Sequence, residues 1–101
     1  SRLMEALTPA VKAIDALAWS ILGVALKAGS PGYFEVTNIR ASSPAQQIGM
    51  QKRDLLLAVN GRRLKNQALL RNALVDLRGA NYARLIVQRG NSQYHVTIPL
   101  Q

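Results

Sequence analysis

At 101 residues and 49% hydrophobic composition, the chain has the size of a single globular domain with a substantial core. Its net charge of +8 admits an acidic partner, such as a nucleic acid, an anionic membrane surface or a carboxylate. The chain has no cysteine, which excludes disulfides and thiol chemistry, and no apolar run approaches the roughly 18–20 residues that span a membrane.

The N-terminal part, residues 2–18, is predicted to be an amphipathic helix. Its apolar residues recur at spacings of three and four, as on one face of a helix: Leu3, Leu7, Val11, Ile14 and Leu17. Proline lacks an amide donor, so Pro9 either kinks this helix or begins a second one that Thr8 caps. The helix either packs on its own domain or docks on a partner, and self-association through residues 2–18 is one form of docking. The first residues lack the basic flank and apolar core of a signal peptide.

The stretch WSILGVAL, residues 19–26, is nearly all apolar, shows no helical period and is interrupted by Gly23. Glycine weakens a strand interior, so this position indicates either buried core or a backbone that approaches another group closely. We assign residues 1–19 to an N-terminal helix or linker and residues 20–101 to one domain that begins with this stretch.

A strand and a short helix are predicted next. Residues 33–40, YFEVTNIR, alternate apolar and polar side chains and include β-branched residues, which is typical of a half-buried strand. Residues 41–50 carry the start and stop signals of a short helix: Ser43 as N-cap, Pro44 in the first turn, Gln46 in a capping box and Gly49 at the end.

The remaining residues predict strands around a second helix. A strand over 54–64 turns at Asn60-Gly61, the pair favoured where both central residues need positive φ. Residues 66–79 predict a helix capped by Asn66, and residues 84–100 predict two strands. The expected fold is α+β: a small, partly open β-barrel or sandwich of five to six strands with two helices, plus the extra N-terminal helix.

Four stretches resemble a PDZ domain, in the bacterial strand order of HtrA/Deg-type proteases. They are ILGV (21–24), SPAQQIGMQKRDLLLAVNG (43–61), LLRNAL (69–74) and LIVQRG (85–90). They follow the family's order and approximate spacing and, with the final strand, cover about residues 20–100. The resemblance implies a PDZ fold and a non-catalytic, peptide-binding domain that needs no cofactor.

The resemblance also implies a binding site. The carboxylate-binding loop and the start of the peptide-pairing strand would be Ile21, Leu22, Gly23, Val24, Ala25 and Leu26. A terminal carboxylate needs several converging backbone N–H donors, and a glycine lets it approach them. The other wall would be the second helix, through Gln67, Arg71 and Leu74.

The expected ligand follows from these residues. An apolar pocket formed by Ile21, Leu22, Val24 and Leu74 predicts a last ligand residue of Val, Leu, Ile or Phe. Arg71 would favour an acidic residue upstream in the peptide.

Two positions depart from the family pattern. Arg53 stands where the family usually has glycine, and an arginine at positive φ is strained by on the order of 1 kcal/mol. We therefore expect the turn before Asp54 to be shifted. Ile21 stands where the loop usually has an aromatic residue, and Trp19 lies two residues earlier.

Catalytic and metal sites are not indicated. The chain has one histidine, His95, on the alternating last strand, and Ser92 nearby lies at a predicted turn. With one histidine, no cysteine and no carboxylate cluster, we predict no enzymatic activity, no metal and no cofactor in this domain.

Nucleic acid is a partner of another class. From residue 50 onward the chain has nine positive and two negative residues, including the run GRRLK at 61–65. These charges are scattered over predicted strands, turns and a helix, and the five aromatic residues show no interleaved stacking pattern. This disfavours a nucleic-acid partner; the run also suits a solvated turn or a patch that faces anionic lipid.

We therefore predict a peptide-recognition module that binds free C-termini, or exposed apolar peptide ends, by β-strand addition. Its parent would be an HtrA-type serine protease in the periplasm or cell envelope, membrane-associated, with the catalytic domain elsewhere. The alternative is a non-proteolytic assembly or scaffold PDZ domain of a membrane-associated or secretion complex. A basic nucleic-acid-binding domain ranks below both.

Overall fold

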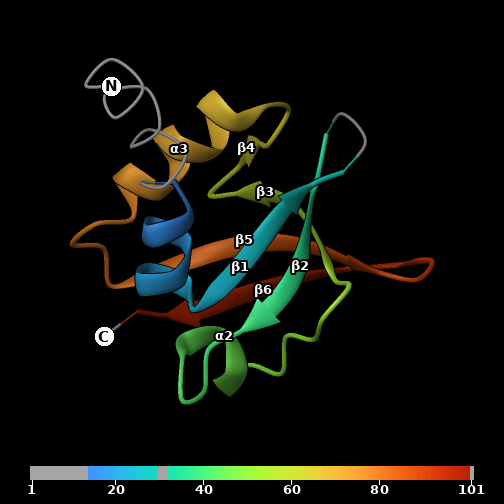
Figure 1. Cartoon of the computed structure of the whole chain (residues 1–101), viewed down its shortest axis with the longest axis horizontal. Helices are drawn as coiled ribbons and strands as arrows, with labels where there is room; N and C mark the ends of the chain where they lie inside the picture. Colours follow the sequence, from blue (N-terminus) through green and yellow to red (C-terminus); the bar gives the residue numbers. More distant parts are fainter. Residues whose placement is uncertain (1–13, 30–31, 101) are drawn as a thin grey trace, which may run out of the picture.

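The computed structural model describes residues 14–29 and 32–100, and its centre is a curved antiparallel sheet of six strands (Figure 1). Five strands follow the order β1-β2-β3-β5-β6, and β4 pairs with β3 outside that path. The strands are β1 (Val24–Ala28), β2 (Phe34–Ile39), β3 (Leu55–Val59), β4 (Arg62–Arg63), β5 (Tyr82–Arg89) and β6 (Ser92–Pro99). With helices α2 (Pro44–Gln47) and α3 (Gln67–Asp76), this arrangement confirms the predicted α+β fold.

The chain enters the sheet through a helical segment, residues 14–22. Residues 14–17 are α-helical and the π-helix η1 (Ala18–Leu22) continues them. The prediction that residues 19–26 lack helical structure was therefore wrong for residues 19–22. Ala18 and Leu22 are almost completely buried, at 1% and 0% exposure, so tertiary packing extends the apolar helix face to Gly23. The predicted helix over residues 2–13 lies outside the described residues.

The short helix α2 has the caps that its sequence predicts. Ser43 Oγ accepts a hydrogen bond from the Gln46 N–H at 3.1 Å, and Pro44 occupies the first turn. The Gln46 side chain accepts from the N–H of Ser42, at 2.6 Å, so the capping box closes one residue earlier than its standard form.

The turns and caps around α3 also follow the prediction. Asn60 and Gly61 both have positive φ, +51° and +82°, as a two-residue turn of this type requires. Asn66 Oδ1 accepts from the Leu69 N–H at 2.9 Å and caps α3, which ends at Asp76, earlier than predicted. Three leucines of its apolar stripe, Leu70, Leu74 and Leu77, are at most 1% exposed, so α3 closes one side of the core.

The turn before β3 corrects one expectation. Arg53 does adopt positive φ, +77°, so the turn is not shifted. The surrounding contacts hold it: the Arg53 N–H donates to Val36 O at 2.7 Å. The carboxylate of buried Asp54 accepts from the Gln51 N–H and, at 2.8 Å for each oxygen, from Arg89.

Asp54 stays ionised in this turn. Burial alone would raise the pKa of Asp54, but the hydrogen bonds from Arg89 and the Gln51 N–H, with the positive charge of Arg89, outweigh it. The net effect lowers the pKa of Asp54 below its ordinary value. An ion pair between buried Asp54 and the exposed side chain of Arg89, 35 residues apart in sequence, thus supports a strained turn.

Candidate functional site

Gly23 joins the helical segment to β1, and only glycine fits there. Its φ is +88°, and a Cβ at this position would lie 2.1 Å from Ser43 Cβ and 2.3 Å from Ser43 Oγ. Ser43 is itself fully buried and caps α2 through the same hydroxyl. The close approach that the glycine in WSILGVAL indicates is therefore to the N-terminus of α2.

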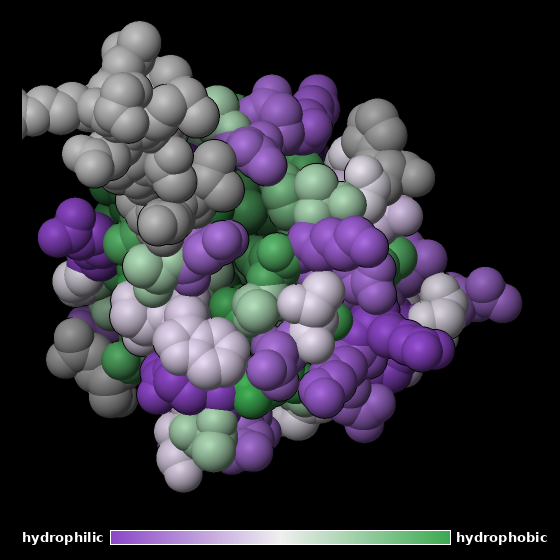
Figure 2. All heavy atoms as spheres, in the orientation of Figure 1, coloured by the Kyte–Doolittle hydropathy of each residue, from purple (hydrophilic) through white to green (hydrophobic). Residues whose placement is uncertain are grey.

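β1 is an edge strand of the described sheet. Its one strand neighbour is β2, in a register that places Val24 opposite Ile39. Val24 is fully buried, whereas Ala25 and Leu26 are partly exposed. Figure 2 shows hydrophobic atoms along β1 in the middle of this face, while hydrophilic side chains gather toward the β5–β6 hairpin. An edge strand with exposed apolar atoms has the geometry for strand addition.

The wall opposite β1 is α3, and the helical segment lies in the groove between them (Figure 1). The space left in this groove is a cavity of about 40 Å³. Its lining combines Ile14, Asp15 and Ala18 of the helical segment, Leu26, Ala28 and Phe34 of the sheet, and Gln67 and Leu70 of α3. The groove is thus filled by the chain's own residues.

The predicted site residues divide by exposure. Leu22, Gly23, Val24 and Leu74 are buried, and Leu74 at 0% exposure belongs to the core. Ile21, Ala25 and Leu26 are partly exposed, and Gln67 and Arg71 are exposed on α3. Gln67 lines the cavity of the groove, whereas Arg71 does not.

The end of the groove holds a residue that sequence reasoning missed. Arg40 follows β2, and its side chain donates to the carbonyls of Trp19 at 3.1 Å and Ser20 at 3.4 Å. The backbone N–H of Arg40 donates to Gly23 O at 2.7 Å, and the backbone N–H of Gly23 donates to Ala18 O at 2.9 Å. The pairing of β1 with β2 could have placed Arg40 near Gly23, but only if the register were known.

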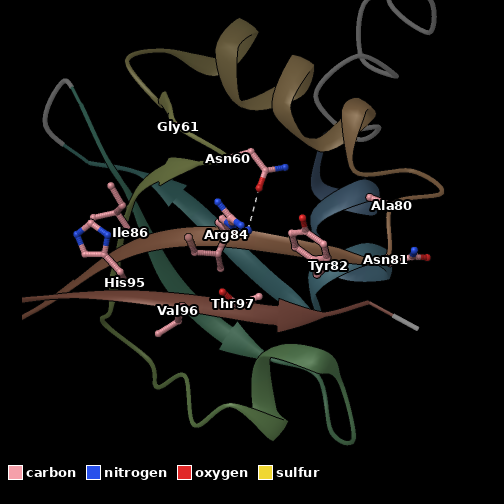
Figure 3. A pocket seen from close by; sticks show the side chains of 11 residues that line it. Asn60, Gly61, Ala80, Asn81, Tyr82, Arg84, Ile86, His95, Val96 and Thr97 are labelled. Atoms are coloured by element: carbon pink, nitrogen blue, oxygen red, sulfur yellow. Dashed lines mark hydrogen bonds between the residues drawn. The ribbon is translucent and has the colours of Figure 1, made fainter.

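A second, larger hollow lies on the other face of the sheet, where β5 and β6 pass in front of β1 and β2 (Figure 3). Its volume is about 750 Å³. Its lining includes Asn60, Tyr82, Arg84, Ile86, His95 and Thr97. Asn60 Oδ1 accepts from the Arg84 N–H at 2.8 Å, and none of the predicted site residues lies there.

His95 sits on this face, exposed and opposite Ile86 in the β5–β6 register, as expected for a surface strand residue. Among the described residues, no group of three or more histidine, cysteine or acidic side chains could hold a metal ion.

Several cations have internal partners. Arg62 pairs with Asp76, Arg89 with Asp54, and Arg40 with helix carbonyls. The positive charge of the chain is therefore partly committed to its own fold. Across the described residues, no helix is both long and apolar enough to cross a membrane.

The family model for the PDZ domain matches residues 20–100, which include all six strands and both α2 and α3. The chain belongs to the PDZ-domain family. The resemblance seen in the sequence, to PDZ domains of the HtrA type, is confirmed.

Known relatives include PDZ domains of proteases and of secretion proteins. This PDZ domain is 39% identical over 61 residues to the periplasmic serine endoprotease DegP of Salmonella typhimurium. The aligned region covers 60% of this chain but only 12% of DegP. The HtrA3 PDZ domain bound to a phage-derived ligand, FGRWV, superposes with a TM-score of 0.67 at 23% identity, covering 79% of this chain and 84% of that one.

A third relative is the PDZ domain of the pullulanase C protein of the type II secretion system of Klebsiella pneumoniae, in complex with a fatty acid. Its TM-score is 0.59 at 24% identity, covering 79% of this chain and 87% of that one. At these identities the two structural similarities establish the fold alone.

Proposed function

We propose that this PDZ domain recognises the free C-termini, or exposed apolar ends, of peptides, which add as a strand to β1 and lie against α3. The observation that carries this proposal is the edge strand β1, which begins after Gly23 at positive φ and faces α3 across a groove with both apolar and polar lining. Main-chain hydrogen bonds to β1 would provide affinity, and side-chain pockets would provide selectivity.

Each proposed binding residue has a distinct part. Ile21, Leu22 and Gly23 form the turn that receives the carboxylate; Val24, Ala25 and Leu26 pair with the peptide; Gln67, Arg71 and Leu74 belong to the α3 wall. Because Leu22, Val24 and Leu74 are fully buried, they form the floor beneath an apolar last residue and do not reach into the groove. The ligand of the HtrA3 PDZ domain ends in valine, which supports an apolar last residue.

The parent protein is proposed on weaker similarity. The match to DegP supports a substrate-recognition or regulatory domain of an envelope serine protease, located in the periplasm. The pullulanase C neighbour favours a second candidate, a scaffold PDZ domain of a secretion complex without proteolysis. In both cases any catalytic machinery lies outside this domain, and the parent is a membrane-associated envelope protein.

A fluorescence-polarisation titration tests the binding proposal. The full chain is titrated against labelled FGRWV as the free acid and as the C-terminal amide, and against peptides ending in Leu and Phe. We expect the free acids to bind and the amides to bind at least about tenfold more weakly, because the amide loses the charge-assisted hydrogen bonds at Gly23. Equal binding of acid and amide would overturn the proposal, as would absence of binding both by this chain and by a variant whose helical segment is destabilised.

A salt titration separates this function from phosphate recognition. Contacts with many phosphates lose affinity by orders of magnitude between 50 and 200 mM salt, so an affinity for peptide that changes less than about threefold is expected here. Tighter binding to single-stranded DNA than to peptide, with a steep salt dependence, would instead favour nucleic acid.

A further inference from the structure

Two hydrogen-bond donors at the end of the groove are held by the helical segment itself. They are the Gly23 N–H and the Arg40 guanidinium, which we call the donor pair. The Gly23 N–H donates to Ala18 O, and Arg40 donates to Trp19 O and Ser20 O. These three successive carbonyls lie in the last turn of η1, where a helix has unpaired oxygens and its partial negative charge. The helix end thus places negative oxygens on the donors that a carboxylate would use.

We propose that residues 14–20 are a built-in competitor for the groove, and that a peptide's terminal carboxylate takes over the donor pair as these residues withdraw. This inference rests on the proposed peptide-binding function and adds Arg40 as a carboxylate ligand. For the Gly23 N–H, a carboxylate is a stronger acceptor than a carbonyl, because a hydrogen bond with an ionised partner is roughly twice as strong as one between neutral groups. For Arg40, whose bonds to carbonyls already have a charged donor, a carboxylate adds an opposite charge and the option of a bidentate pair.

The arguments from space and charge agree with this exchange. Ile14, Asp15 and Ala18 occupy the groove and leave a cavity of about 40 Å³, too small for an extended peptide to lie beside β1. Arg40 takes part in neither of the two ion pairs among the described residues. Its guanidinium can therefore exchange one acceptor for another without leaving a carboxylate unpaired.

The hinge for this movement lies at the end of η1. Leu22 is fully buried in the core, which anchors the segment, whereas Trp19 and Ser20 are exposed. Withdrawal of residues 14–20 would keep the anchor at Leu22 and the tight contact of Gly23 with Ser43, and would take buried Ala18 out of the core, which is the cost that a bound peptide must offset.

The chain carries its own reporter of this movement. Trp19 is its single tryptophan, lies in the helical segment and is 37% exposed. We would measure acrylamide quenching of Trp19 while the full chain is titrated with FGRFV, a tryptophan-free peptide, as free acid and as amide. A saturable rise in quenching, with the same Kd as labelled FGRFV gives in fluorescence polarisation, is the expected result for the free acid.

Three variants sharpen the measurement. Ala16 is exposed within the helical segment, so Ala16→Gly lowers helix stability without opening the core and should tighten the apparent Kd about fivefold. Ala68→Gly makes the same change at an exposed position of α3 and should leave the Kd within twofold. Arg40→Gln should increase the quenching of Trp19 before any peptide is added and remove most of the preference for free acid over amide.

The outcomes separate this inference from the function on which it rests. Peptide binding with unchanged Trp19 quenching, and with equal Kd for the unsubstituted chain and Ala16→Gly, would overturn the proposal that residues 14–20 compete for the groove. It would leave the proposed peptide-binding function in place. If neither the unsubstituted chain nor Ala16→Gly bound the peptide, the proposed function would be overturned and, with it, this inference.

Discussion

Two concave regions of the molecule, the groove and the hollow, differ in size and in the groups that they present. The groove between β1 and α3 has a cavity of about 40 Å³ left, whereas the hollow over β5 and β6 measures about 750 Å³. The groove ends in backbone and guanidinium donors around Gly23, and the hollow is lined by side chains on the outer faces of strands. Volume is therefore a poor guide here, because the smaller region has the directed donors that recognition requires.

The two regions also differ in how far their linings belong to the core. The groove cavity is lined in part by the buried residues Ala18, Phe34 and Leu70, whereas the lining of the hollow is mostly exposed, as at Arg84 and His95, with Leu85 its one buried residue. Substitutions on the groove side should therefore change binding and cost more stability than substitutions at the hollow. The predictions below test that difference from the largest effect to the smallest.

Leu74→Ala should have the largest effect. Leu74 is 0% exposed on α3, and removing a buried leucine side chain leaves a cavity, so we expect a loss of about 2–5 kcal/mol in the free energy of unfolding. Ile86→Ala in the hollow, at a partly exposed position, should lose about 1–2 kcal/mol. Urea denaturation followed by circular dichroism measures both. If the two variants lost equal amounts, Leu74 would be a groove residue and not part of the core.

Gly23→Ala should have the second-largest effect, a loss of about 2–4 kcal/mol in the free energy of unfolding. The new Cβ would both adopt positive φ and overlap Ser43, which cannot move without breaking the α2 cap. Gly61→Ala in the hollow is the matched control, because its φ of +82° is similar but no atom lies within 4 Å of the added Cβ. It should lose about 1–2 kcal/mol, the strain alone. Equal losses at both glycines would mean that the contact with Ser43 carries no energy.

The same comparison explains what the sequence could predict. The caps at Ser43 and Asn66 and the turn at Asn60-Gly61 depend on groups within four residues of one another, so local chemistry determines them. The contacts of Arg40 with Trp19 and Ser20 span 21 and 20 residues and depend on the register of two strands. The sequence therefore identified Gly23 as special but not its neighbour Ser43, nor the helical segment in the groove.

Arg53 illustrates the same limit in a single turn. Intrinsic preference argues against an arginine at positive φ, and the expectation of a shifted turn followed from that preference. The contacts that outweigh it come from Val36 and from Arg89 acting through Asp54, both distant in sequence. Local preferences were thus overridden where contacts distant in sequence, through buried Asp54, held the backbone.

A titration to low pH tests whether the groove and the hollow unfold together. The pKa of Asp54 is lowered in the folded state, so its stabilising contribution is present above the unfolded value of about 4 and is lost as the pH falls below it. Asp54→Asn should lose about 1.5–3 kcal/mol at pH 7 and flatten the acid dependence. Trp19 emission, near the groove, and far-ultraviolet circular dichroism should report the same midpoint.

The control for this titration is Asp76→Asn, whose partner Arg62 and own side chain are about half exposed. It should change stability by less than about 1 kcal/mol and leave the acid transition in place. An unchanged acid transition in Asp54→Asn would assign the transition to another carboxylate. Different midpoints for Trp19 and for circular dichroism would show that the helical segment leaves the groove before the sheet unfolds.

Arg84→Glu should have the smallest effect and decides whether the hollow takes part in peptide binding. Arg84 is exposed and its guanidinium lies over the ring of Tyr82, 5.7 Å from its centroid, so charge reversal should alter the free energy of unfolding by less than about 0.5 kcal/mol. The affinity for FGRWV should stay within twofold, because the hollow opens on the face of the sheet away from β1 (Figure 3). Fluorescence polarisation measures this affinity, and Arg40→Gln serves as the sensitive comparison. If Arg84→Glu weakened the peptide more than Arg40→Gln, the ligand would lie over β5 and β6, and the larger region would be the functional one.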